Sequence, residues 1–149
     1  MNSAAHHIQA ISVRNLQRTV KADVAELEAF ARQALRICLN IKCGGVTDLE
    51  KAREISVLIV SDRRMESLHR KFLNEAGTTD VLTFQHGEIF ISAETARRNT
   101  RRFGTNLRTE LCLYVVHGLL HLHGFDDREP NAKKRMEALQ SEIFERAAV

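Results

Sequence analysis

LCLYVVHGLLHLHGFDD, residues 111–127, is the stretch that decides the fold of this chain. Its first twelve positions are apolar nearly all the way round a helix, which is typical of a helix buried on every side. Gly124 can adopt the left-handed conformation that ends a helix. The stretch therefore predicts a central helix from about Asn106, a good N-cap, to His123, after which the chain turns back.

The same stretch places metal-binding side chains one helical turn apart. His117 and His121 are four residues apart, so their Cβ atoms lie about 6 Å from each other on one face. Two imidazoles at this spacing can bind one Zn²⁺ at about 2.0–2.1 Å each. After the turn at Gly124, Asp127 can supply the third ligand, and Asp126 is the alternative ligand, a cap, or an acceptor that orients an imidazole.

A structural role is the competing interpretation, because histidines on apolar helices are more often hydrogen-bonded core residues than ligands. Buried imidazoles need partners, and a helix-ending glycine followed by carboxylates favours a metal as that partner. His123 lies about 200° round the helix from His121. We therefore expect a surface or cap role for His123.

Composition sets the class of protein. A chain of 149 residues is the size of one domain, so we expect a single domain over residues 1–149. A net charge of +3 permits a nucleic-acid partner without requiring one. Cys38, Cys43 and Cys112 form no C-x-x-C pair and indicate free thiols. No signal peptide or long apolar run is present, so we expect a cytoplasmic protein that binds no membrane.

The remaining pattern mixes strands and helices. We predict strands at 7–13, 54–60, 81–85 and 88–91, and helices at 23–39, from 61 or 62 through 72, 92–103, 106–123 and 130–147. His86 and Gly87 form the turn of a hairpin between the third and fourth strands. The fold class is thus α+β, with about four strands in a mixed sheet packed with helices. Phosphate-binding glycine motifs are absent, which argues against a nucleotide cofactor.

Three protein ligands leave a fourth position on zinc, the arrangement of a catalytic site. The pattern also resembles that of metzincin proteases, with Gly124 in register. Residue 118, however, is glycine, so the glutamate that serves those proteases as general base is missing and proteolysis is disfavoured. A glycine inside a helix is often kept for close packing or for substrate approach.

Residues 117–127, HGLLHLHGFDD, resemble the signature H-G-x-L-H-L-x-G-Y-D-H of the YbeY family of bacterial ribosomal-RNA maturation factors. TDVLTF at 79–84, GEIFIS at 87–92 and NLQR at 15–18 resemble further family segments in the same order. The resemblance implies a metal-dependent, single-strand-specific endoribonuclease with one Zn²⁺ per chain. It also implies action on the 3′ end of the small-subunit ribosomal RNA, contact with that subunit, and ribosome quality control.

Two positions depart from the family pattern. Asp127 stands where the family has a third histidine, and Leu73 stands where it frequently has an arginine that contacts substrate. A carboxylate ligand reduces the net charge of a zinc site and predicts weaker Lewis acidity. Arg70, one turn earlier, is a candidate replacement for the arginine. The alternative function is a metal- and RNA-binding ribosome-assembly factor with little catalysis. The sequence identifies no general acid or base.

A basic cluster precedes the central helix, formed by Arg97, Arg98, Arg101, Arg102 and Arg108. Such a run is commonly a solvated helix face. It can equally be a track for the phosphates of single-stranded RNA beside the metal. Glu110, two turns before His117, either favours the helix N-terminus or supports the metal ligands. We retain Arg70, Arg97, Arg98, Arg101 and Arg102 as RNA-binding candidates.

Overall fold

The structure, a computed structural model, describes residues 10–73 and 80–148. Its sheet has the strand order β1-β2-β4-β3, with β1 at Ala10–Asn15, β2 at Glu54–Val60, β3 at Val81–Phe84 and β4 at Glu88–Ser92. β1 and β2 pair in parallel, as do β2 and β4, whereas β3 and β4 are antiparallel. The predicted mixed sheet with a hairpin is confirmed.

Gly87 fixes the turn between β3 and β4. Its φ of 111° lies in the region that favours glycine, and a Cβ there would collide with the backbone oxygen of Glu54. Gly87 also accepts a 2.9 Å hydrogen bond from the amide of Ser56, which ties the hairpin to β2. The glycine therefore sets both the turn and its fit against the neighbouring strand.

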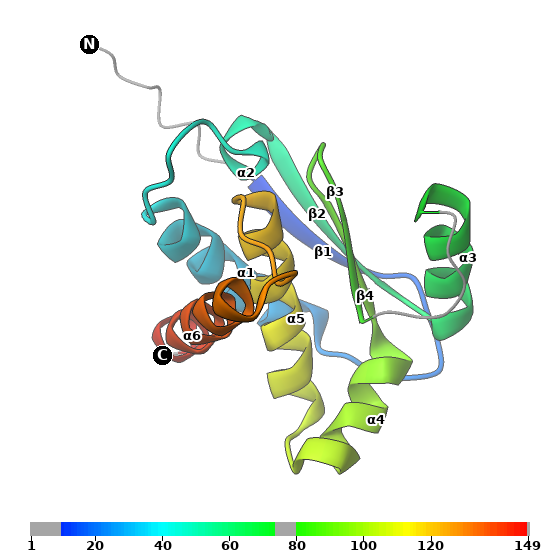
Figure 1. Ribbon diagram of the computed structural model, residues 1–149. Helices are drawn as coiled ribbons and strands as arrows, with labels where there is room; N and C mark the ends of the chain where they lie inside the picture. The colour runs from blue at the N-terminus through cyan, green and yellow to red at the C-terminus, as the bar shows by residue number, and fades with distance from the viewer. Residues whose placement is uncertain (1–9, 74–79, 149) are drawn as a thin grey trace.

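Three helices lie on one side of the sheet: α1 at Val24–Leu39, α5 at Leu107–Leu122 and α6 at Pro130–Ala147 (Figure 1). α1 packs on β1, α5 on β3 and β4, and α6 on both α1 and α5. Alternate residues of the strands point into this layer, so Ile55, Val57 and Ile59 are fully buried. The main core therefore lies between the sheet and these helices, with α5 at its centre.

The opposite face carries α3, at Asp62–Leu73 (Figure 1). It covers a smaller apolar cluster of Val60, Met65, Leu68 and Leu82, with Phe90 packed beside them. α4, at Ala93–Phe103, follows β4 directly and leads into α5. Among the helices of residues 10–73 and 80–148, none is long and apolar enough to span a membrane.

Gly118 brings α5 close to the sheet. A Cβ at this position would lie 2.6 Å from Ile89 Cγ2 and 3.1 Å from Ile89 Cδ1, whereas carbon atoms in contact lie about 3.5–4.0 Å apart. Of the two roles that the sequence left open for this glycine, the structure supports close packing. The histidine-bearing helix is thereby held against β4.

Most predicted elements are present within a residue or two. Ser92 caps α4 and Asn106 caps α5, as predicted. Ser61, rather than Asp62, caps α3, because its Oγ accepts from the amide of Arg64 at 3.1 Å. The short helix α2, at Asp48–Lys51, was not predicted; it begins at a capping box built by Thr47. Residues 7–9 of the predicted first strand lie outside the described residues.

Candidate metal centre and its cleft

Three side chains converge where α5 ends. His117 Nε2 lies 3.0 Å from His121 Nε2, and Asp127 Oδ2 lies 3.9 Å from His117 Nε2. One ligand atom from each of the three lies within 4.8 Å of the others. The turn that returns Asp127 starts at Gly124, whose φ is 95°, as the sequence predicted. The structure thus brings the three predicted ligands together.

The donor set fits a metal ion such as zinc. Two ligands of a tetrahedral zinc, each at 2.0–2.1 Å from the ion, lie roughly 3.3 Å apart. The separations of 3.0 and 3.9 Å lie on either side of this value, and the third pair, His121 and Asp127, lies within 4.8 Å, so the carboxylate would move toward the imidazoles when a metal binds. The side chain of Asp127 is 44% exposed, against 25% for His117, so the carboxylate lies on the open side of the group.

Gln140 orients one of the two imidazoles. Its Oε1 lies 3.0 Å from His117 Nδ1 and accepts a hydrogen bond when that nitrogen carries the proton. The proton on Nδ1 leaves the lone pair of Nε2 pointing at the donor group. Sequence reasoning missed Gln140. The available signal was its position on α6, in the stripe of buried Met136, Ile143 and Ala147 where an apolar residue is expected.

His121 is held in its neutral form. Burial lowers its pKa below the usual 6.5, and the nearby His117 lowers it further, against the opposing effects of Asp127 and a backbone hydrogen bond with Phe125. A metal ligand must be an unprotonated imidazole. Burial on α5 therefore prepares this side chain for coordination at neutral pH.

His123 has a structural role. It is the C-cap residue of α5 and is fully buried, so the predicted cap role is confirmed and the predicted surface location is wrong. Its Nδ1 lies 2.9 Å from Thr47 Oγ1 and its Nε2 lies 2.7 Å from the backbone oxygen of Ile41. Both ring nitrogens are engaged, and the imidazole ties the segment before α2 to the end of α5.

Asp126 is a local cap. Its Oδ1 accepts from the backbone amide of Arg128 at 3.2 Å, one of the roles that the sequence left open for it. Glu110 is buried at the start of α5, and its Oε2 accepts from Thr105 Oγ1 at 2.6 Å. Neither carboxylate belongs to the group formed by His117, His121 and Asp127.

A cleft of about 420 Å³ opens beside the donor group, with walls from α4, α5 and α6. His117, Asp127 and Gln140 line one part of it, and Phe103 lies at another. Among the described lining residues, the carboxylates outnumber the cations: the former are Asp80, Glu110, Asp127 and Glu137, and the latter is Lys133. The cleft walls are therefore acidic before a metal binds.

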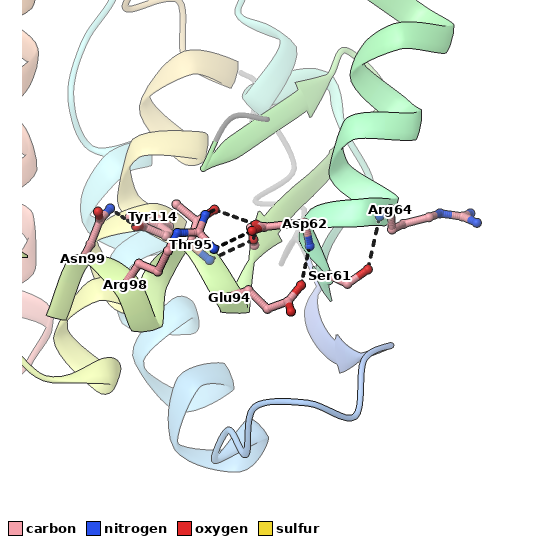
Figure 2. A network of polar contacts seen from close by, with 9 residues as sticks. Ser61, Asp62, Arg64, Glu94, Thr95, Arg98, Asn99 and Tyr114 are labelled. Atoms are coloured by element: carbon pink, nitrogen blue, oxygen red, sulfur yellow. Dashed lines mark hydrogen bonds and ion pairs between the residues drawn. The ribbon is translucent and has the colours of Figure 1, made fainter. Parts of the chain in front are cut away.

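The predicted RNA-binding arginines do not form one group. Arg98 pairs with Asp62 at 2.6 Å in the polar network that joins α3 and α4 (Figure 2). Arg70 pairs with Glu66 at 3.2 Å on α3, on the sheet face opposite α5. Arg97, Arg101 and Arg102 are exposed on α4. Within the cluster, Arg102 lies next to the cleft, because its guanidinium carbon is 5.2 Å from the ring centre of Phe103, a residue of the cleft wall.

Asp62 is the centre of the network in Figure 2. Burial raises the pKa of its carboxyl, but hydrogen bonds from Arg98, Ser92 and Thr95 outweigh burial and lower the pKa overall. The backbone amide of Asp62 also donates to Glu94 Oε1 at 2.8 Å. These contacts fix the start of α3 to the start of α4 and give Arg98 a structural partner.

Comparison with known proteins gives the family. The family described as Endoribonuclease YbeY matches residues 12–148. A protein of that name from Thermobifida fusca is 35% identical, over 61% of this chain and 70% of its own length. One from Bacteroides fragilis is 32% identical, over 70% and 80%. A Thermotoga maritima protein of known solution structure superposes with a TM-score of 0.63 at 25% identity, covering 92% of this chain and 88% of its own. The chain belongs to the YbeY family.

Proposed function

We propose that this protein is a metal-dependent, single-strand-specific endoribonuclease. Its substrate would be ribosomal RNA, at the 3′ end of the small-subunit RNA, with a further part in ribosome quality control in the cytoplasm. The observation that carries the proposal is the convergence of His117, His121 and Asp127 beside a cleft that His117 and Asp127 line. Membership of a family described as endoribonucleases supports the substrate class.

In this proposal the three converging side chains hold one Zn²⁺ per chain. The ion supplies Lewis-acid chemistry for hydrolysis of a phosphodiester. Gln140 orients the imidazole of His117, and the close packing at Gly118 holds α5 in place. Because the described cleft walls carry more carboxylates than cations, most of the attraction for phosphate must come from the bound ion and from Arg97, Arg101 and Arg102 outside the cleft.

The second candidate is a ribosome-assembly factor that binds metal and RNA but cleaves poorly. The carboxylate at position 127 favours it, because an anionic ligand reduces the net charge of the metal site and with it the Lewis acidity. Both candidates require the donor group to bind a metal. They differ in whether single-stranded RNA is cut.

Cleavage of a labelled single-stranded RNA by the metal-loaded protein tests the proposal. The wild type should cut the single strand, spare the same sequence in a duplex, and lose activity when a chelator is added. His117→Ala should abolish cleavage, whereas His86→Ala, at an exposed histidine of the hairpin turn, should not. RNA binding without cleavage would favour the assembly factor. Cleavage that survives both the chelator and His117→Ala would refute the proposal.

A further inference from the structure

Phe103 is an exposed aromatic residue in the wall of the cleft beside the donor group. It is the last residue of α4, is 59% exposed, and is followed by Gly104, whose φ of 65° ends the helix. Single exposed apolar side chains are ordinary. The other large ones among the described residues, Leu16, Val46 and Phe72, do not line this cleft, whereas Phe103 does, together with His117 and Asp127.

The charges on the cleft wall determine whether a base or a phosphate of an RNA strand binds there. Besides the proposed ligand Asp127, the lining carries the carboxylates of Glu110 and Glu137 against one cation, Lys133, so this part of the wall offers a phosphate little net attraction. A nucleobase is neutral, and its flat face matches an exposed phenyl ring. The wall around Phe103 therefore suits a base, and the phosphates of the strand would lie nearer the donor group or outside the cleft.

Positive charge lies beside Phe103. The guanidinium carbon of Arg102 is 5.2 Å from the centre of the ring, and the side chain of Arg102 is exposed. Arg102 can thus support a stacked base and approach a neighbouring phosphate. An aromatic ring beside a basic track is the combination that binds single strands without sequence preference.

We propose that Phe103 is the base-stacking residue of the cleft. A nucleobase of a single-stranded RNA stacks on its exposed ring, Arg102 contacts a neighbouring phosphate, and the strand continues toward His117 and Asp127. The inference rests on the proposed function, because it takes RNA as the ligand. It adds a binding site for a nucleobase, separate from the metal-binding group of His117, His121 and Asp127.

The test compares two phenylalanines. Phe103→Leu keeps an apolar side chain and removes the ring, and Phe72→Leu is the matched control, because Phe72 is 55% exposed on α3 and has Lys71 Nζ 5.4 Å from its ring centre. The probe is a fluorescein-labelled 2′-O-methyl RNA decamer, confirmed intact on a gel after the anisotropy measurement. Phe103→Leu should weaken binding by about tenfold, and Phe72→Leu should leave it unchanged.

Two further readouts separate stacking from charge and from folding. Stacking releases no counterions, so Phe103→Leu should leave the slope of log affinity against log salt unchanged, whereas Arg102→Ala should reduce it by about 0.7. The sequence contains no tryptophan. Phe103→Trp therefore introduces a single tryptophan, whose selectively excited emission should be quenched by the unlabelled decamer and left unchanged by an unlabelled abasic strand of equal length.

The inference would be overturned if Phe103→Leu bound the decamer with wild-type affinity, or if Phe103→Trp bound the decamer without quenching. Contact with a protein partner would then be the alternative role of the ring. An equal loss in Phe103→Leu and Phe72→Leu would also overturn the inference. If the wild type cuts RNA and only these results fail, the proposed function stands. If the wild type neither binds nor cuts RNA, both fail together.

Discussion

Replacing Gly118 with alanine tests how the histidine-bearing helix is held against the sheet. Alanine should stabilise the helix by about 1 kcal/mol through propensity. Its Cβ, however, would lie 2.6 Å from Cγ2 of the fully buried Ile89, and overpacking of this kind costs about 1–3 kcal/mol. We expect Gly118→Ala to lower the free energy of unfolding by about 1 kcal/mol in urea denaturation.

A double-mutant cycle makes this prediction sharper. Ile89→Ala removes the three side-chain carbons that would lie within 3.3 Å of an alanine Cβ at position 118, at a cost of about 2–5 kcal/mol. In that background Gly118→Ala should become stabilising by about 1 kcal/mol, because only the propensity remains. Gly44→Ala, where a Cβ meets nothing within 4 Å, is the control and should change little. Equal effects of Gly118→Ala in both backgrounds would refute the packing argument.

Substitutions at three other positions test the network and the donor group. The pKa of Asp62 is lowered in the folded state, so its carboxylate stabilises the fold above about pH 4, and this stability is lost as the pH falls through the folded-state pKa. In urea denaturation, the difference in unfolding free energy between wild type and Asp62→Asn should therefore shrink from pH 6 to pH 2. Gln140→Leu should weaken metal affinity by about 10–100-fold in a chelator competition, and Gln140→Glu, which keeps the acceptor, should not. Asp127→His should retain the metal in the same assay, and Asp127→Ala should weaken it.

Local signals made the fold predictable. Alternating apolar residues, the caps at Ser92 and Asn106 and the glycine at the hairpin turn each act over a few residues, and each was predicted correctly from the sequence. The four-residue helix α2 was missed because its capping box begins no apolar run. The cap role of His123 was predicted, but its burial was not, because its partners Thr47 and Ile41 are about eighty residues away in the chain.

The same limit applies to the site. The spacing of His117 and His121 is a property of one helix, so the sequence predicts their convergence. Gln140 reaches His117 only because α6 packs on α5, and no local pattern specifies that contact. Arg98 likewise looked free in the sequence, whereas the network at Asp62 engages it. The helices and strands could be predicted from the sequence, whereas most contacts between them became known only from the structure.

The metal content of the purified protein tests the central claim most directly. After dialysis against trace zinc, elemental analysis should find about one Zn²⁺ per chain in the wild type and in His86→Ala. His117→Ala, His121→Ala and Asp127→Ala should each contain much less, while circular dichroism shows that they remain folded. Full zinc content in the three variants, or none in the wild type, would contradict the claim that His117, His121 and Asp127 form the metal centre.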